Sequence, residues 1–254
     1  MDFRGRVALV TGGGTGIGRA VAESLGRAGA RAVVINYSRS QEEAEATATA
    51  LGEMGVEGIP WRADVADERD VRDMVSGVVE RLERLDVLVN NAGTTHFIPQ
   101  RDLESLTDQV WDDILRVNLK GTFYCSRASA PHLRQAHGAI VNVTSVAGMR
   151  ATGSSIAYGV SKAGVEQLTR NLALALAPEV RVNAVAPGQV ATRWFRRPFG
   201  EQAADDLEQK RADSTPLRGV ATPGHIAQAI MGLLAAEFVT GQTLVVDGGA
   251  SINY

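Results

Sequence analysis

Tyr158 and Lys162 stand four residues apart in a stretch, 156–177, that is predicted to form one helix. Residues at positions i and i+4 of a helix lie on one face, one turn apart. A free tyrosine is a poor proton donor or acceptor near neutral pH because its pKa is about 10. A lysine ammonium one turn away favours the phenolate and lowers that pKa. The pair therefore indicates a general acid or base, although this spacing alone also occurs by chance in helices.

Ser145 adds a hydroxyl group to this candidate site. It follows an apolar run over 139–143, which predicts a buried strand, and it precedes Tyr158 by 13 residues. Its hydroxyl could bind the same substrate oxygen as the tyrosine. A serine-hydrolase interpretation fails, because Ser145 lacks the G-x-S-x-G pattern and has no evident histidine partner.

A glycine-rich turn near the N-terminus predicts a phosphate-binding site. Residues 7–10 predict a buried strand and residues 19–27 a helix, and T-G-G-G-T-G-I-G lies between them at 11–18. Glycines allow the backbone to approach a pyrophosphate, and the helix N-terminus supplies free N–H groups. The spacing G-x-x-x-G-x-G is one residue longer in its first gap than the common dinucleotide fingerprint.

The end of the second predicted strand, 32–35, bears on the choice of cofactor. An acidic residue there would select NAD by accepting a hydrogen bond from the ribose 2′-hydroxyl. This chain has Asn36-Tyr37-Ser38-Arg39-Ser40 instead, and Arg39 suits the 2′-phosphate of NADP(H). The alternative is an exposed arginine that merely precedes a helix over 41–54.

Two further strand ends carry polar residues. The third strand ends near Asp64 and Val65, where Asp64 either meets an adenine amino group or is a loop aspartate beside the helix-capping Asp67. The fourth strand, 85–89, ends in Asn90-Asn91-Ala92-Gly93. Ligands of open α/β sheets bind at these carboxyl ends.

The rest of the chain alternates in the same way, without an internal repeat or a linker. A predicted helix over 108–133 is interrupted at Asn118, where we expect a local distortion that exposes a carbonyl. Residues 189–216 combine aromatic side chains with arginines, which fits a substrate lid whose basic residues are solvated or pair with Glu201, Asp205 and Asp206. The sequence predicts one α/β domain over 1–254, a doubly wound parallel sheet of about seven strands with helices on both faces.

Composition excludes several classes of protein. The formal net charge of −3 argues against a nucleic-acid or anionic-membrane surface, and no apolar run is long enough to span a bilayer. The N-terminus lacks the apolar region of a signal peptide. Cys125 is the only cysteine and is expected to be a buried, inert thiol, which suits a reducing cytoplasm. The four histidines are not at ligand spacing, so no metal site is expected.

With these parts together, the chain resembles the short-chain dehydrogenase/reductase family over about residues 3–250. The motifs that carry the resemblance occur in the family's order and spacing; they are Thr11-Gly12-x-x-x-Gly16-Ile17-Gly18, Asn90-Asn91-Ala92-Gly93, Asn118, Ser145, Tyr158-x-x-x-Lys162, Pro187-Gly188 and Thr192. Within the family it is most similar to NADPH-dependent 3-oxoacyl-carrier-protein reductases, through Asn36-Tyr37-x-Arg39-Ser40 and Val246-Asp247-Gly248-Gly249.

The resemblance implies an NADP(H)-dependent reduction of a carbonyl, with Tyr158 as general acid and Asn118, Ser145 and Lys162 beside it. Asn118 would anchor a water that passes protons to Lys162. Subunits would form a dimer or tetramer through the helices that begin at Asp108 and Ile156. The implied cofactor-binding residues are Gly12, Thr15, Gly16, Ile17, Gly18, Tyr37, Ser38, Arg39, Asp64, Val65, Asn91, Ala92, Gly93, Tyr158, Lys162, Pro187, Gly188, Val190 and Thr192.

Two departures from the family pattern are visible. Many of these reductases carry an arginine where this chain has Thr15, so Arg39 has less help at the 2′-phosphate. Those that serve the carrier protein tend to have basic residues where this chain has Ala136 and Pro178-Glu179.

The side chains expected around the substrate carbonyl are mostly apolar; they are Thr94, His96, Phe97, Met149, Trp194 and Phe195. Uncharged ketones or β-keto esters are therefore the expected substrates, without a carrier protein. Two alternatives are an NAD-dependent alcohol or sugar dehydrogenase of the same family and a dinucleotide sensor without turnover. The presence of Ser145, Tyr158 and Lys162 together counts against the sensor.

Overall fold

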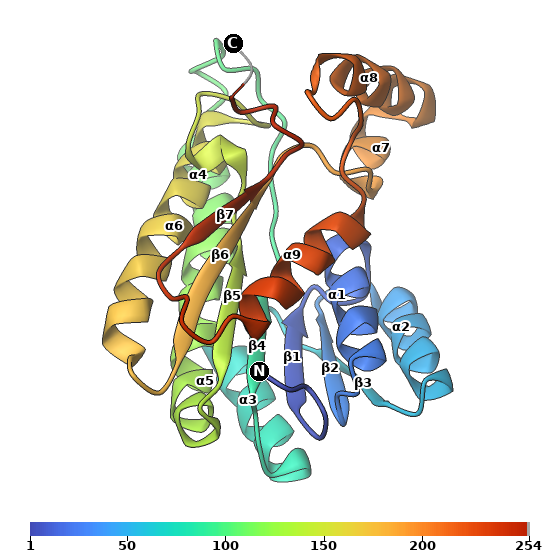
Figure 1. Cartoon of the computed structure of the whole chain (residues 1–254). Helices are drawn as coiled ribbons and strands as arrows, with labels where there is room; N and C mark the ends of the chain where they lie inside the picture. The colour runs from blue at the N-terminus through green and yellow to red at the C-terminus, as the bar shows by residue number, and fades with distance from the viewer. Residues whose placement is uncertain (253–254) are drawn as a thin grey trace.

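The computed structural model describes residues 1–252, apart from the side chains of Phe195, Arg197 and Pro198. Its centre is a sheet of seven parallel strands in the order β3-β2-β1-β4-β5-β6-β7 (Figure 1). The strands are β1 Val7–Thr11, β2 Ala32–Tyr37, β3 Glu57–Arg62, β4 Val87–Asn90, β5 Ala139–Val143, β6 Arg181–Pro187 and β7 Thr243–Val246. The predicted doubly wound fold is confirmed.

Helices cover both faces of this sheet (Figure 1). They are α1 Gly16–Arg27, α2 Gln41–Glu53, α3 Glu68–Leu82, α4 Asp108–Leu115, α5 Thr122–Ala136, α6 Ile156–Leu176, α7 Arg193–Phe199, α8 Glu201–Ser214 and α9 Pro223–Ala235. None of the helices in the described part of the chain is long and apolar enough to cross a membrane.

The strands are apolar along their whole length because each of their faces meets a different set of helices. Side chains of a strand point alternately to opposite faces. Ala8 and Val10 pack in a core with α1, α2 and α9, whereas Val7 and Leu9 pack in a second core with α3, α5 and α6. Period-2 alternation is therefore hidden in the sequence, as is usual for parallel sheets.

Helix ends follow local sequence signals. Asp67 caps α3 by accepting from the backbone N–H groups of Arg69 and Asp70, as the sequence predicted. Between α4 and α5 the predicted interruption is a π-helical segment, Arg116–Gly121, which contains Asn118. One extra residue in a turn shifts the helix face locally, and such bulges are frequent at functional sites.

The predicted lid, 189–216, contains α7 and α8, which lie beyond the carboxyl ends of the strands (Figure 1). Arg196 of α7 pairs with Glu201, Asp205 and Glu208 of α8. The expectation that basic residues of this segment pair with its own acids is therefore confirmed for Glu201 and Asp205. Arg196 fastens α7 to α8 at the surface.

At the amino ends of β1 and β4, the buried carboxylate of Asp86 links the two strands. Asp86, which is fully buried just before β4, accepts from Arg6 at 2.7 Å, from Arg84 at 2.6 Å and from the backbone N–H of Val7 at 2.9 Å. Burial by itself raises the pKa of Asp86, but the hydrogen bonds from Arg84, Val7 and Arg6 together lower it below its usual value. The group thus joins β1 to β4.

We expect Asp86→Ala to lower the free energy of unfolding by roughly 2–4 kcal/mol, because it leaves the Val7 N–H unpaired and two arginines without their counter-charge. A folded-state pKa below the unfolded value means that this stabilisation is present above the unfolded pKa, about 4, and is lost as the pH falls below it. Urea unfolding at pH 7 and pH 3 measures both effects. Glu104→Ala, at an exposed position, is the control and should change stability by less than about 0.5 kcal/mol.

Candidate functional site

Tyr158 and Lys162 lie one turn apart on α6, as their spacing predicted. Ser155 caps this helix by accepting from the backbone N–H of Tyr158 at 3.2 Å, so the tyrosine sits in the first turn. The Lys162 Nζ lies 5.7 Å from the centre of the Tyr158 ring. Ser145, which follows β5, hydrogen-bonds to the tyrosine side chain. Three of the predicted catalytic residues therefore meet at the carboxyl edge of the sheet.

Lys162 is held in an enclosed position. Its Nζ donates to the carbonyl oxygen of Val143, the last residue of β5, at 2.8 Å, and the side chain is buried. Desolvation by burial lowers the pKa of Lys162 to about 8. A Cβ built on Gly93 would lie 3.8 Å from this Nζ and 3.4 Å from the Asn118 Oδ1. The glycine leaves room for both groups at the end of β4.

The pKa of Tyr158 differs from the expectation. Burial raises the pKa of Tyr158 to about 12, and the hydrogen bond from Ser145 offsets only part of this rise. The lysine does not reverse the effect here, because its ammonium points to the Val143 carbonyl rather than to the phenol oxygen. In this structure the tyrosine is therefore held in its protonated form at neutral pH.

Asn118 connects the π-helical segment to the loop after β4. Its Oδ1 accepts from the backbone N–H of Thr94 at 2.8 Å, and its Nδ2 donates to the Thr94 carbonyl and to the Ser161 hydroxyl, each at 3.0 Å. Ser161 in turn donates to the Tyr158 carbonyl at 2.7 Å. Ser161 was not predicted as a site residue, although its position three residues after Tyr158 puts it on the same side of α6. Asn118 thus positions the tyrosine helix through Ser161.

Lys162→Met should remove a pH dependence of stability. The folded-state pKa of Lys162, about 8, lies below the ordinary value of 10.5, so the unfolded chain binds more protons between these values. Stability therefore rises as the pH passes upward through about 8. From pH 7 to pH 9 the free energy of unfolding should rise by about 1 kcal/mol more in the wild type than in Lys162→Met. Urea unfolding of both proteins at both pH values measures this; equal slopes would contradict it.

The glycine-rich turn forms a cradle at the carboxyl end of β1. Gly12 and Gly16 have φ angles of +62° and +52°, which favour glycine, and a Cβ on Gly18 would lie only 2.3 Å from the Gly12 carbonyl oxygen. Ile17 packs at the edge of the core. Thr15 precedes α1 without a side-chain cap, so the first N–H groups of α1 have no side-chain partner there. An anion such as a pyrophosphate fits this position.

The cradle lies at β1, where the order of the strands in the sheet reverses. β1 pairs with β2 on one side and with β4 on the other, and dinucleotides bind at this switch point in doubly wound sheets. Thr11 and Asn91 hold the two strand ends together: the Thr11 hydroxyl accepts from the N–H groups of Asn91 and Ala92 at 3.0 Å, and Asn91 Nδ2 donates to the carbonyls of Thr11 and Gly12. The role of the Thr11 hydroxyl was not foreseen.

The predicted adenosine side of the cradle lies at the end of β2. Tyr37 is half-buried against the core, whereas Ser38 and Arg39 are exposed, and Arg39 makes no hydrogen bond or ion pair with any residue described. Asn36 is buried; it donates to the Ala63 carbonyl at 3.0 Å and accepts weakly from Gly12. An ionised aspartate at position 36 would have no N–H group to donate to the Ala63 carbonyl, and the two oxygens would repel each other. Asn36 is therefore a structural residue, and its replacement by aspartate is not a suitable way to change the cofactor preference.

Asp64 and Val65 lie beyond the end of β3. The Asp64 Oδ1 accepts from the backbone N–H of Ala66 at 2.9 Å, and the side chain is exposed. Val65 is buried and packs against Gly121 of the π-helical segment. Asp64 therefore shapes its own loop in this structure, which is the alternative that the sequence left open.

The segment that follows β6 lies beside the glycine-rich turn. Pro187 ends the strand, and the N–H of Gly188 donates to the Val246 carbonyl of β7. Val190 is buried in the core, and Thr192 begins α7 by accepting from the Trp194 N–H. A Cβ on Gly16 would lie 3.4 Å from the Thr192 methyl group. The lid therefore starts directly against the glycine turn.

Aromatic residues of the segment 189–216 lie beside Tyr158 and the loop after β4. The ring of Trp194 lies 6.1 Å from that of Tyr158, and Phe199 meets Phe97 of the loop after β4 edge to face, at 4.9 Å between centroids. These contacts enclose the candidate site with apolar surface. Met149 is half-exposed. The side chain of Phe195, also expected here, lies outside the described residues.

His96, the remaining polar residue in the expected substrate pocket, pairs with Asp113 of α4 at 3.2 Å. The described residues hold no group of histidine, cysteine, aspartate and glutamate side chains that could bind a metal ion.

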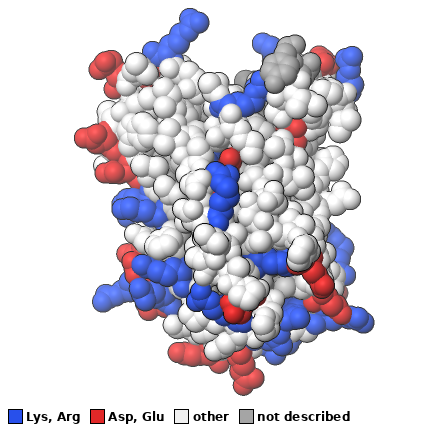
Figure 2. Space-filling view, turned by 60° about the vertical axis from the view of Figure 1, so that its left-hand side comes forward, with Lys and Arg blue, Asp and Glu red and all other residues white. Residues whose placement is uncertain are grey.

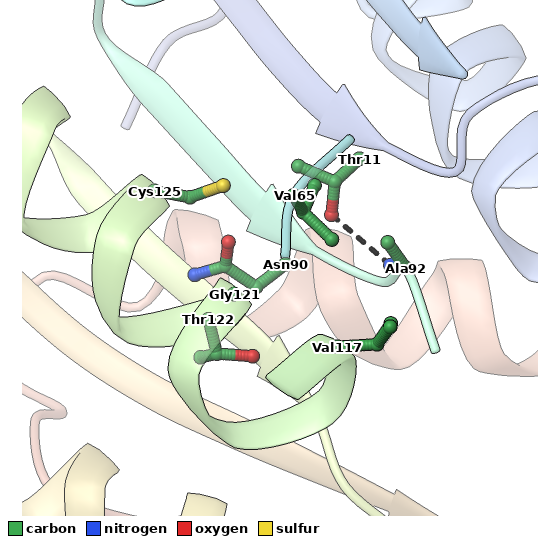
Figure 3. Close-up of a pocket in the computed structure, with 8 residues that line it drawn as sticks. All are labelled: Thr11, Val65, Asn90, Ala92, Val117, Gly121, Thr122 and Cys125. Atoms are coloured by element: carbon green, nitrogen blue, oxygen red, sulfur yellow. Dashed lines mark hydrogen bonds between the residues drawn. The ribbon is translucent and has the colours of Figure 1, made fainter. Parts of the chain in front are cut away.

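Figure 3 shows a small pocket behind the Thr11–Ala92 hydrogen bond, between the end of β4 and the π-helical segment. Cys125 lines it and is buried. The prediction of a buried thiol is confirmed, and burial raises the pKa of the Cys125 thiol to about 12, which disfavours the reactive thiolate. Asn90, which also lines the pocket, donates to Asn142 and Ser126 and thereby ties β4 to β5 and α5.

Comparison with known proteins adds to this geometry. Residues 12–251 match the family model described as enoyl-(acyl carrier protein) reductase. The putative ketoacyl reductase 2 of the granaticin polyketide synthase from Streptomyces violaceoruber is 47% identical over 97% of this chain and 96% of its own length. The 3-oxoacyl-[acyl-carrier-protein] reductase FabG of Staphylococcus aureus is 39% identical over 95% of this chain and 96% of its own.

A solved structure has the same fold. The crystal structure of a putative short-chain dehydrogenase/reductase from Burkholderia xenovorans superposes with a TM-score of 0.90 at 34% identity, over 97% of this chain and 98% of the other. The fold and the relatives define a doubly wound oxidoreductase. The chain belongs to the short-chain dehydrogenase/reductase family, which confirms the resemblance stated from the sequence.

Proposed function

We propose that this protein reduces a carbonyl to a secondary alcohol with NADPH, and catalyses the reverse oxidation with NADP. The observation that carries the proposal is the meeting of Tyr158, Lys162 and Ser145 beside the glycine cradle. The names of the relatives support the same reaction, since both contain a ketoacyl or 3-oxoacyl reductase.

In this proposal Tyr158 is the general acid. The bound cofactor supplies a hydride to the carbonyl carbon, and the oxygen then needs a proton and hydrogen-bond donors. The pKa of Tyr158, about 12 in the structure, keeps its proton available before the reaction. Ser145 binds the substrate oxygen. The positive charge of Lys162, strengthened by that of an oxidised nicotinamide ring, lowers the pKa of Tyr158 as the proton leaves.

Lys162 and Asn118 would return the proton. The pKa of Lys162, about 8, lies near the working pH, which suits a group that gains and loses protons readily. The Asn118 side-chain oxygen and the Lys162 Nζ both lie beside Gly93. A water held by Asn118 would pass protons between Lys162 and solvent.

NADP(H) is the proposed cofactor because Arg39 stands exposed at the end of β2 and no acidic residue occupies that end. Residues from four strand ends would hold it: the glycine turn after β1, Tyr37 to Arg39 after β2, Asp64 and Val65 after β3, and Asn91 to Gly93 after β4. Pro187, Gly188, Val190 and Thr192 would bind the nicotinamide end, with Thr192 at the carboxamide.

The proposed substrates are uncharged ketones or β-keto esters. Trp194 and Phe97 give the substrate side an apolar lining. The family resemblance implies basic residues at the carrier-protein contact, and this chain has Ala136 and Pro178-Glu179 at those positions, so a carrier protein has fewer positive charges to bind here.

The test is the oxidation of NADPH and of NADH, followed by absorbance, with a panel of small ketones, β-keto esters and one carrier-protein thioester. We expect turnover of small uncharged substrates with NADPH. A strict need for the thioester would contradict the proposed substrate class. Preference for NADH would favour an NAD-dependent dehydrogenase, and cofactor binding without any turnover would favour a sensor.

We further propose that subunits associate through α4, α5 and α6. Val160 and Leu174 of α6 and Phe123 of α5 are exposed apolar residues. Figure 2 turns the side of the molecule that carries α6 forward; much of the upper part of this face is white, and the charged side chains lie near its centre and towards its lower edge. Sedimentation of the wild type and of Leu174→Glu tests this: the wild type should be a dimer or tetramer, and the variant should shift towards monomer.

A further inference from the structure

Arg193, the first residue of α7, reaches across the glycine turn to α2. Its guanidinium pairs with the Glu43 carboxylate and donates to the Ser40 hydroxyl at 2.8 Å. Ser40 directly follows Arg39 and is the last residue before α2, and its side chain makes no capping hydrogen bond to that helix. A residue 150 positions away in the sequence therefore lies beside the candidate 2′-phosphate position.

A hollow of about 500 Å³ lies at this crossing, lined by Gly14 and Thr15 of the turn and by Arg193 on the lid side. Arg19 also lines it but is bonded to Glu23 within α1. Position 15 of the turn is a threonine and carries no charge. Arg193 therefore brings a cation into this hollow from the segment after β6.

We propose that Arg193 is a second binding residue for the 2′-phosphate of NADP(H), and that Glu43 competes with the phosphate for it. This inference rests on the proposed function. A guanidinium has five N–H donors in a planar fork, and the contacts to Glu43 and Ser40 leave donors free for phosphate oxygens. Because Arg193 begins the lid, a phosphate bound there also holds the lid against the cofactor cradle.

The competition with Glu43 follows from charge. The Glu43 carboxylate is the counter-ion of Arg193 in this structure, and a phosphate dianion placed beside it is repelled by that carboxylate. Replacing Glu43 by glutamine removes the repulsion and frees the guanidinium while keeping the shape of the side chain. Glu43→Gln should therefore tighten the binding of a 2′-phosphate, whereas a merely structural salt bridge would be weakened by the same change.

The test measures binding without turnover. Calorimetry gives dissociation constants for adenosine 2′,5′-bisphosphate and for ADP with the wild type, Arg193→Ala, Glu43→Gln and Arg196→Ala. We expect Arg193→Ala to weaken the bisphosphate about tenfold, the scale of one charge-assisted hydrogen bond, and ADP by less than about twofold. Glu43→Gln should tighten the bisphosphate about threefold, a modest gain because the pair is partly exposed to solvent.

Arg196→Ala is the matched control, since Arg196 is also an arginine of α7 but, among the residues that the structure describes, its ion pairs are with acids of α8. It should leave both dissociation constants unchanged. Equal losses for both ligands in Arg193→Ala, or weaker binding of the bisphosphate by Glu43→Gln, would overturn the inference. If the wild type binds the bisphosphate no better than ADP, the proposal that NADP(H) is the cofactor fails. If the wild type prefers the bisphosphate to ADP and Arg193→Ala keeps the same preference, only the inference about Arg193 fails.

Discussion

Tyr158→Phe is expected to lower kcat by at least about 100-fold, the usual scale for loss of a general acid, while NADPH still binds. The change removes one oxygen atom and leaves the ring that packs beside Trp194. It also leaves the Tyr158 backbone N–H bonded to Ser155 and the backbone carbonyl bonded to Ser161, so α6 keeps its position. Stopped-flow single turnover and NADPH fluorescence titration separate the chemical step from binding.

Tyr124→Phe is the matched control, because Tyr124 lies on α5 beside Phe123 and Arg127. It should keep wild-type kcat. Near-native turnover of the Tyr158→Phe protein would show that another group donates the proton. A fall in kcat accompanied by an equal loss of NADPH affinity would assign the tyrosine to cofactor binding instead.

Arg39→Ala is expected to weaken NADPH binding by roughly 10- to 1000-fold, since each hydrogen bond to a charged group contributes about 1.5–3 kcal/mol and one or two are lost. Exposure of Arg39 places the loss towards the lower end of this range, because solvent and salt screen the phosphate. NADH lacks the phosphate, so its use should be almost unchanged. The measurement is kcat/KM for both cofactors in the wild type and the variant.

Arg62→Ala serves as the control for Arg39, since Arg62 is also an exposed arginine, at the end of the neighbouring strand β3. It should leave the preference for NADPH intact. Equal losses with both cofactors in Arg39→Ala, or a wild type that already prefers NADH, would show that Arg39 is only a surface residue.

Much of the fold could be predicted because its signals are local. The apolar run at 243–246 coincides with β7, and the run at 139–143 coincides with β5, since short buried strands lie between turn residues. The polar Asn118 followed by Gly121 marked the π-helical segment, because both residues weaken a regular helix. Strand order and the division into two cores required the tertiary structure, since they arise from contacts between distant segments.

The tyrosine–lysine pair could also be predicted, because a spacing of four residues in a helix fixes their relative position. The pKa of the tyrosine side chain could not be predicted from the sequence. Its pKa, about 12, depends on burial and on Ser145, and the Lys162 ammonium is drawn to the carbonyl of Val143 on another element.

The sequence by itself determined the family, the seven-stranded sheet and the positions of the chemically active side chains along the chain, because each is written in spacing and periodicity. Tertiary structure alone decided which polar side chains of the candidate site are already hydrogen-bonded to other residues of the protein. Asn36 is buried against the Ala63 carbonyl, Asp64 bonds within its own loop, and Arg193 crosses from the lid to Glu43. Each of these partners lies on a loop or helix whose position is set by packing, and packing depends on the whole chain at once.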